Sequence, residues 1–263
     1  MIADQILTPL QFLLGGVSGG LVGFTLGLVG GGGSILAVPL ILYLVGIKSP
    51  HVAIGTSALA VAANAAIALG NHARRGTVEW RCAGIYAAAG VVGALIGSSI
   101  GKAFDGQRLL LLFGILMLVV SVLMVRHRAH EGNALIACGH DRLPRVLSYG
   151  GMTGIFSGFF GIGGGFLVVP GLMASTGMPM LKAVGSSLVA VTAFGLATAA
   201  NYAFSGYVNW PLAAIFILGG IGGCWLGARM ATVLSARKGT LNSILATIIC
   251  AMAVFLIHKS AHG

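Results

Sequence analysis

The sequence predicts an all-α integral membrane protein made of two homologous, inverted repeats, each with a glycine-broken half-helix. The chain of 263 residues is 57% hydrophobic and 8% charged, whereas a soluble domain carries about a quarter charged residues. Its mean hydropathy is +0.99, and its apolar residues form blocks of roughly membrane-helix length rather than short alternating strands. These values exclude a soluble globular domain and a disordered chain. The third observation is an internal repeat.

The repeat emerges when the chain is aligned with itself. GLVGGGGSILAVP at 27–39 matches GFFGIGGGFLVVP at 158–170 without gaps, with seven of thirteen positions identical. Further along, AIGTS at 53–57 matches AVGSS at 183–187, and GTVEW at 76–80 matches GYVNW at 206–210. Because the order and spacing of these landmarks agree, the chain is interpreted as a duplication.

Each half contains five apolar segments. They cover 6–29, 33–47, 52–70, 82–101 and 108–125 in the first half, and 147–162, 165–177, 183–204, 211–229 and 240–257 in the second. The predicted organisation is a membrane repeat at 1–125, a polar linker at 126–146 and a second membrane repeat at 147–263. Segment 165–177 is shorter than the roughly 20 residues that a straight spanning helix needs. It is therefore predicted to be a half-helix or a re-entrant element.

Basic residues in the loops predict the topology. If each half crosses the membrane an odd number of times, the basic residues divide 11 to 4 between the two sides, and an even number of crossings divides them 8 to 7. The side with 11 holds Arg74, Arg75, Arg81, Arg126, Arg128, Arg142, Arg145, Lys182, Arg229, Arg237 and Lys238. The positive-inside rule favours the uneven division. The repeats are thus expected to be inverted, in a bacterial-type inner membrane, with both termini outside the cytoplasm.

The N-terminal segment is expected to be retained as a span. MIADQILTPL has no Lys or Arg before its apolar run, which is unlike a cleavable signal peptide. The net charge is +10, but the basic residues are spread over short loops. They therefore indicate membrane topology and not a nucleic-acid-binding surface.

Ionisable residues argue against an enzyme and against a metal or cofactor site. The five acidic residues lie in the N-terminal tail, the linker or loops: Asp4, Glu79, Asp105, Glu131 and Asp141. No predicted span contains a carboxylate for acid–base chemistry or a proton relay. The histidines are expected in loops or near the ends, with His51 the one nearest the repeated motifs. Because the four cysteines show no CxxC spacing, they are expected to be small hydrophobic residues rather than disulfide partners or metal ligands.

The glycine-rich breaks are the first candidate binding element. They comprise Gly30, Gly31, Gly32, Gly33 and Ser34 before Pro39, and Gly161, Gly163, Gly164 and Gly165 before Pro170. A glycine costs a helix interior roughly 1 kcal/mol relative to alanine, so these runs predict interrupted helices. Backbone N–H groups at the start of the following helix suit an anion, and paired broken helices point to a transporter's central site. The alternative is close helix packing, which explains the spacing of Gly93 and Gly97.

Two hydroxyl pairs form the second candidate element, Thr56 with Ser57 and Ser186 with Ser187. Hydroxyls can donate to an oxyanion without burying a charge. The alternative is that each bonds back to a carbonyl of its own helix, four residues earlier. Asn64, Asn71 and Asn201 are weaker candidates, and Trp80 and Trp210 are expected to anchor their helices at the headgroup boundary. The predicted substrate-binding set is Gly30, Gly32, Gly33, Ser34, Thr56, Ser57, Gly161, Gly163, Gly164, Gly165, Ser186 and Ser187.

Together the repeated G-x-G-G-[GS]-x-x-x-x-P, the A-x-G-[TS]-S and the G-x-V-x-W resemble the TauE/SafE family of sulfite and organosulfonate exporters. The resemblance covers both halves and implies transport of small sulfur-containing anions such as sulfite, thiosulfate or sulfoacetate. In the second half Ile162 stands where the first has Gly31, so the two half-sites need not contribute equally. An alternative function is a non-transporting membrane partner in the assembly or maturation of a sulfur- or metal-handling enzyme.

Overall fold

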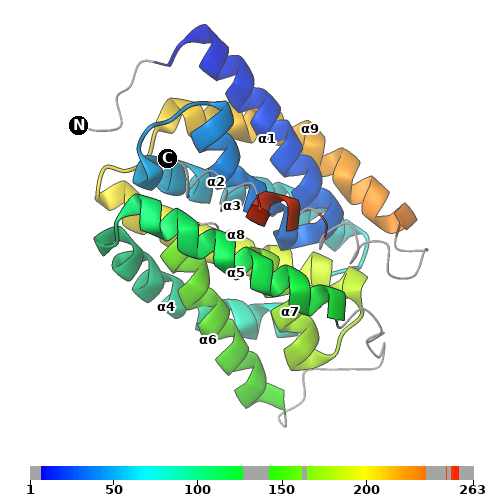
Figure 1. Cartoon of the computed structure of the whole chain (residues 1–263). Coiled ribbons are helices and arrows are strands. Elements are labelled where there is room, and N and C mark those ends of the chain that lie inside the picture. Colours follow the sequence, from blue (N-terminus) through cyan, green and yellow to red (C-terminus); the bar gives the residue numbers. More distant parts are fainter. Residues whose placement is uncertain (1–6, 127–141, 162–164, 235–246, 248–249, 255–263) are drawn as a thin grey trace.

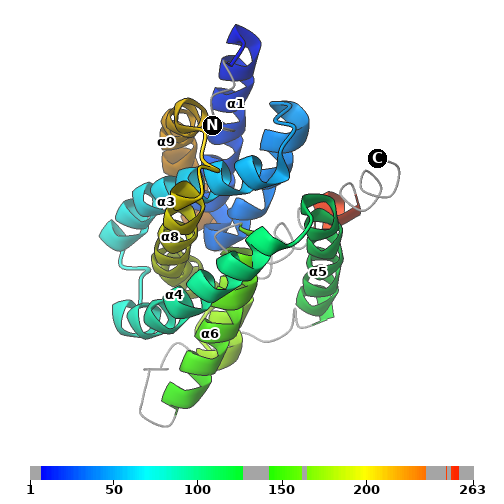
Figure 2. The same ribbon diagram turned by 90° about the vertical axis from the view of Figure 1, so that its left-hand side faces the viewer.

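The fold is known from a computed structural model, which describes residues 7–126, 142–161, 165–234, 247 and 250–254. Within these residues all regular structure is helical and no strand occurs, so the all-α prediction is confirmed for them. In the described part of the chain, five helical segments are long and apolar enough to cross a membrane: Pro9–Leu44, Pro50–Arg74, Trp80–Ala103, Met180–Phe204 and Trp210–Ala231. Figures 1 and 2 show the helices from two sides.

The first half consists of α1 (Pro9–Val29), a 3₁₀ helix (η1, Gly30–Leu36), α2 (Ala37–Pro39), a π-helix (η2, Leu40–Leu44), α3 (Pro50–Arg74), α4 (Trp80–Ala103) and α5 (Gly106–Arg126). The second half contains α6 (Leu143–Phe160), α7 (Gly165–Thr176), α8 (Met180–Phe204) and α9 (Trp210–Leu234). α6 begins at Leu143, inside the predicted linker. Most of the predicted segment 240–257 lies outside the described residues, although 247 and 250–254 are helical.

The chain between α1 and α3 turns back on itself. The Gln11 side chain, in the first turn of α1, donates to the carbonyl of Val45 at 3.2 Å, so the segment after the glycine run returns to the start of α1. At the other end, His72 of α3 lies 2.9 Å from the carbonyl of Gly27 near the end of α1. α1 and α3 therefore point the same way. The short turn 75–79 then reverses the chain into α4.

Helix α1 packs along α9 through glycine (Figure 1). A β-carbon on Gly19 would lie 2.0 Å from the carbonyl oxygen of Phe216, and one on Gly27 would lie 2.4 Å from that of Cys224. Successive turns of α1 thus meet successive turns of α9 in the same order. The two helices run parallel, at a separation that only glycine permits.

Helices α4 and α6 form an equivalent interface. A β-carbon on Gly154 would lie 2.1 Å from the carbonyl oxygen of Gly90, and one on Gly158 would lie 2.1 Å from that of Ala94. In the repeat alignment, α6 corresponds to α1 and α4 to α9. The same pair of helices therefore meets twice, with the roles of the two halves exchanged. The glycines at these two interfaces confirm the close helix packing that the sequence predicts for glycines outside the two glycine-rich runs.

The glycine-rich run of the first half is an interrupted helix, as predicted, but the interruption is a tightened helix rather than an extended loop. Gly30–Leu36 form seven residues of 3₁₀ helix, longer than the three or four residues usual for this conformation. After Pro39 the chain widens into the π-helix Leu40–Leu44, in which the Val45 N–H donates to the Leu40 carbonyl, five residues earlier, at 2.9 Å. In the second half α7 is 12 residues long with Pro170 inside it, which confirms a short helix there.

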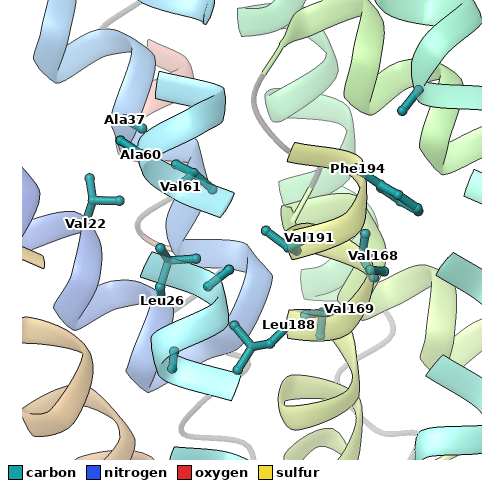
Figure 3. Close-up of a cluster of buried hydrophobic side chains, with 14 of the residues drawn as sticks. Val22, Leu26, Ala37, Ala60, Val61, Val168, Val169, Leu188, Val191 and Phe194 are labelled. Atoms are coloured by element: carbon teal, nitrogen blue, oxygen red, sulfur yellow. The ribbon is translucent and has the colours of Figure 1, made fainter. Parts of the chain in front are cut away.

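Apolar side chains from both halves fill the centre. Figure 3 shows Val22 and Leu26 of α1 and Val61 of α3 on one side, and Val168 of α7 and Val191 of α8 on the other. Helix α5 stands apart in Figure 2. It contributes Phe113, whose ring centroid lies 5.6 Å from that of Phe160 and 5.9 Å from that of Phe166. The two ends of the second glycine-rich run are thus packed against α5.

Candidate functional site

The two glycine-rich runs meet in space. A β-carbon built on Gly165 would lie 1.8 Å from the carbonyl oxygen of Gly31, and one on Gly31 would lie 2.6 Å from the Cα atom of Gly165. The two backbones are therefore in direct contact, with no room for a side chain on either residue. Gly163 and Gly164 lie outside the described residues. The Gly31–Gly165 contact marks the interface between the two halves at the centre of the predicted site.

Each run begins with a glycine of positive φ that contacts the opposite half. Gly30 and Gly161 both have φ of 66°, a conformation that side chains disfavour. A β-carbon on Gly30 would lie 2.5 Å from the carbonyl oxygen of Val184 in α8, and one on Gly161 would lie 1.8 Å from Ile54 Cγ2 in α3. Ile54 and Val184 are equivalent in the repeat alignment. The two runs thus dock against matching positions of α3 and α8.

Ser187 connects α8 to the first break. Its Oγ accepts a hydrogen bond from the Gly31 N–H at 3.0 Å and donates to the Val184 carbonyl at 2.8 Å. Ser57 Oγ donates to the Ile54 carbonyl at 2.9 Å. Both serines are fully buried. Their hydroxyls bond back to their own helix, which is the alternative left open by the sequence, although the acceptor is three residues earlier rather than four.

Thr56 and Ser186 each accept a hydrogen bond from a loop in the opposite half of the chain. The Asn209 N–H donates to Thr56 Oγ1 at 2.9 Å, and the Glu79 N–H donates to Ser186 Oγ at 2.8 Å. Asn209 and Glu79 are the residues before the tryptophan in the two copies of G-x-V-x-W. The two repeated motifs therefore bind one another across the halves. These two hydroxyls fix the entry of α4 and α9.

Ser34 and the glycines of the first glycine-rich run are buried within the fold. Ser34 Oγ donates to the Gly31 carbonyl at 2.9 Å, and Thr25 Oγ1 lies 3.3 Å from the Gly33 carbonyl. Gly30, Gly32 and Gly33 are buried. Gly33 also packs on α1, since a β-carbon there would lie 2.2 Å from the Leu26 nitrogen. The first break is thus enclosed between α1 and the second half.

The two ends of the α3–α8 pair carry different polar groups. At one end Lys182 Nζ lies 2.5 Å from Glu79 Oε1, and both side chains are partly exposed. At the other end Lys102 Nζ donates to Asn201 Oδ1 and Ser205 Oγ, both at 2.8 Å. Asn201, a weaker candidate from the sequence, is thus a partner of Lys102.

Asn64 presents an unsatisfied amide inside the fold. Both its Oδ1 and Nδ2 atoms are buried without a hydrogen-bond partner, and its carboxamide abuts Gly220 of α9. The equivalent residue in the second half is Phe194, which abuts Gly90 of α4 in the same way. Trp80 and Trp210 are well exposed at the starts of α4 and α9, as expected of interfacial anchors. Asn71 is half-buried in α3.

The sequence interpretation of the histidines was wrong for His72. It was placed among loop and end residues, but it is fully buried in α3 and contacts Gly27, the first residue of the repeated motif. The predicted segment 52–70 ended before Asn71 and His72 because both are polar. Its partner segment, 183–204, runs through the equivalent Asn201 and Tyr202, so the repeat alignment could have revealed the true length of α3.

The cysteines and His51 are the other residues for which the sequence made a prediction. Cys82 is disulfide-bonded, contrary to its interpretation as a small hydrophobic residue, while the Cys224 thiol is buried and donates to the Asn64 carbonyl at 3.3 Å. His51 lies in the first turn of α3 beside Tyr207, with ring centroids 5.6 Å apart. Its Nδ1 atom is buried and has no partner.

The chain is similar to a known family of membrane proteins and to several probable membrane transporters. The sequence model described as "Sulfite exporter TauE/SafE" matches residues 15–256. A "Probable membrane transporter protein" of Xylella fastidiosa (strain Temecula1 / ATCC 700964) is 54% identical over 92% of this chain and 94% of its own length. YunE of Bacillus subtilis, another probable membrane transporter protein, is 28% identical over 90% of this chain and 92% of its own length.

A probable membrane transporter protein of Methanocaldococcus jannaschii, MJ0441, is 28% identical over 90% of this chain and 93% of its own length. No solved structure matches the chain. Since the family match covers both glycine-rich runs and both hydroxyl pairs, the chain belongs to the TauE/SafE sulfite exporter family.

Proposed function

We propose that this membrane transporter carries small sulfur-containing anions such as sulfite, thiosulfate, sulfoacetate or other sulfonates. The observation that supports the proposal is the contact between the two glycine-rich runs, Gly31 against Gly165, with Ser187 bonded to the Gly31 N–H. The Gly31 N–H of the first half and the Ser187 hydroxyl of the second half meet at this contact. Oxyanions of sulfur accept several hydrogen bonds at once, which matches a site of donors without a buried carboxylate.

In this proposal the residues of the predicted set divide into two roles. Ser57 and Ser187 supply hydroxyls that turn from their helix carbonyls toward the anion, and the glycine N–H groups of both runs supply the remaining donors. Thr56 and Ser186 keep the opposite loop in place through their bonds to Asn209 and Glu79. Each hydrogen bond to a charged group contributes about 1.5 to 3 kcal/mol, so a few of them hold the anion without preventing its release.

The proposed substrate site is tested by a Ser57→Ala, Ser187→Ala double variant. We expect the affinity for the transported anion to fall about tenfold or more, because two donors to the charged ligand are lost. Binding and flux of radiolabelled thiosulfate and sulfite into proteoliposomes measure the effect. Ser148→Ala is the matched control, because its hydroxyl also bonds back to its own helix but is exposed on α6.

Two outcomes contradict the proposal. Wild-type affinity in the double variant would show that these hydroxyls do not touch the substrate. Absence of flux for every sulfur oxyanion and sulfonate, in protein that is folded in the vesicle, would favour the alternative of a non-transporting assembly or maturation partner.

We further propose that the halves are inverted in a bacterial-type inner membrane, with both termini outside the cytoplasm. The helix directions support this arrangement. α4 runs opposite to α1, since α1 and α3 point the same way and a short turn joins α3 to α4. α9, the counterpart of α4, runs parallel to α1. Equivalent helices of the two halves therefore have opposite directions, which fits an odd number of crossings in each half.

Cysteine labelling tests the topology. Gly76 and Gly206 lie in equivalent exposed turns, have similar positive φ values of 67° and 74°, and have no atom within 4 Å of an added β-carbon. They therefore form a matched pair. We expect Gly206→Cys to react with a membrane-impermeant maleimide in intact cells, and Gly76→Cys only after permeabilisation, since Arg74 and Arg75 mark its side as cytoplasmic. The unsubstituted protein gives the background, and labelling of both from one side would refute the inversion.

A further inference from the structure

The imidazole of His72 has a hydrogen-bond partner on each nitrogen. Nε2 lies 2.9 Å from the carbonyl oxygen of Gly27, and Nδ1 lies 3.0 Å from Thr77 Oγ1. Since a carbonyl only accepts, Nε2 carries a proton. Thr77 Oγ1 lies a further 3.0 Å from the backbone carbonyl of His72 itself. The threonine hydroxyl therefore has two acceptors within reach, Nδ1 and that carbonyl.

This arrangement satisfies both protonation states of the ring without moving a heavy atom. In the neutral state the Thr77 hydroxyl donates to Nδ1. In the cationic state Nδ1–H donates to Thr77 Oγ1, and the hydroxyl turns to donate to the His72 carbonyl. Nε2–H donates to Gly27 in both. The structure thus provides a site that can take up and release one proton.

The proton site adjoins the first glycine-rich run from two directions. Gly27 lies three residues before Gly30, in the last turn of α1. Thr77 packs on α8 at Gly185, where a β-carbon would lie 2.7 Å from Thr77 Oγ1. Two residues further along α8, Ser187 holds the Gly31 N–H. A charge on His72 is therefore close to the proposed anion site and to the elements that shape it.

The charges around His72 are mainly positive. Arg75, on the turn after α3, donates its backbone N–H to the His72 carbonyl at 3.2 Å, and its guanidinium donates to the Ala228 carbonyl of α9. Arg74 precedes Arg75 in the chain. The ion pair of Glu79 and Lys182 lies across the turn, at the starts of α4 and α8. On α9, the guanidinium of Arg229 lies over the Trp225 ring. The described part of α1 contributes no ionisable side chain. A buried imidazolium here is costly unless an anion lies nearby to compensate it.

We propose that His72 is the proton-coupling residue of this transporter. Its imidazole takes up one proton when a sulfur anion binds, so that the transporter carries the proton and the anion together. The inference rests on the proposed function. An anion at the glycine-rich run stabilises the imidazolium, and by thermodynamic linkage the imidazolium stabilises the bound anion to the same extent. The second half cannot do this at the equivalent position, because Tyr202 and Tyr207 replace His72 and Thr77.

The experiment uses methanesulfonate, which remains a monoanion between pH 5.5 and pH 8, so that only the protein titrates. Binding to purified protein and flux into proteoliposomes are measured across this range, with a pH-sensitive dye in the vesicle lumen. If each anion brings one proton, its apparent Kd rises about tenfold per pH unit over the range in which the empty site is neutral and the occupied site is charged. The dye should report one proton for each anion.

Three variants separate a proton site from a structural histidine. His72→Gln preserves a donor toward Gly27 and an acceptor for Thr77 but does not titrate, so its Kd should be independent of pH and its flux should move no proton. His51→Gln removes another imidazole, at the opposite end of α3, and should retain the wild-type pH dependence. If His72→Gln does not fold, Thr77→Val tests the same point. It removes both the donor to neutral Nδ1 and the acceptor of Nδ1–H, and because a hydrogen bond to a charged group is the stronger of the two, the pH dependence should shift to lower pH.

The outcomes distinguish this inference from the proposed function. Methanesulfonate flux in the wild type without proton movement, or an unchanged pH dependence in folded His72→Gln protein, overturns the coupling role and leaves anion transport standing. Failure of methanesulfonate, thiosulfate and sulfite alike to bind or move contradicts the proposed function and, with it, the coupling role.

Discussion

Gly165→Ala is expected to abolish transport, although it adds a single methyl group. The β-carbon would lie 1.8 Å from the carbonyl oxygen of Gly31, and the atom in the way is backbone, which cannot swing aside as a flexible side chain can. The two glycine-rich runs would have to separate. Overpacking of a tight core typically costs about 1 to 3 kcal/mol, occasionally more, and here the displaced element is the proposed anion site itself. We therefore expect loss of flux together with a lower unfolding temperature.

Gly151→Ala is the control for this experiment. Gly151 lies in α6, and an added β-carbon there meets nothing within 4 Å. Both changes add one methyl group to a helical glycine, and only the one at Gly165 would collide with Gly31, so loss of transport confined to Gly165→Ala reports that contact. Flux is measured in proteoliposomes and thermal unfolding in detergent. Wild-type transport by Gly165→Ala would show that the close approach of the two runs is not needed for function.

Gly23→Val and Gly154→Val are expected to destabilise the fold strongly and by similar amounts. These residues are equivalent in the repeat alignment, and their β-carbons would lie 2.2 Å from the Gly220 carbonyl oxygen and 2.1 Å from the Gly90 carbonyl oxygen. Either substitution forces a parallel helix pair apart, α1 from α9 or α4 from α6. Since close packing of helix backbones is a main source of stability within a bilayer, each variant should unfold well below the wild type.

The matched controls are Gly222→Val in α9 and Gly84→Val in α4, two glycines with no neighbouring atom within 4 Å of an added β-carbon. Thermal unfolding and size-exclusion chromatography in one detergent compare all four variants. A large effect at Gly23 with none at Gly154, or the reverse, would show that the two interfaces are not equivalent despite their matching contacts.

The sequence by itself determined the helical class, the duplication and the location of the first break. Long apolar blocks leave the backbone no hydrogen-bonding partner in a membrane except its own helix, so hydropathy sufficed for the class. The break at Gly30 followed from the cost of consecutive glycines in a helix. The α7 segment was recognised as short because its length alone is inadequate for a straight crossing. These are local properties of the chain.

The tertiary structure decided which groups these local features meet. The sequence listed Thr56, Ser57, Ser186 and Ser187 as equivalent hydroxyls, but Thr56 and Ser186 hold distant loops while Ser187 binds Gly31, 156 residues away in the chain. The sequence predicted that His72 lies in a loop, because the residues next to it in the chain do not indicate that Gly27 will contact its ring. Hydropathy and spacing are set by neighbours along the chain, whereas a hydroxyl or an imidazole takes its role from the group that packing places within about 3 Å of it.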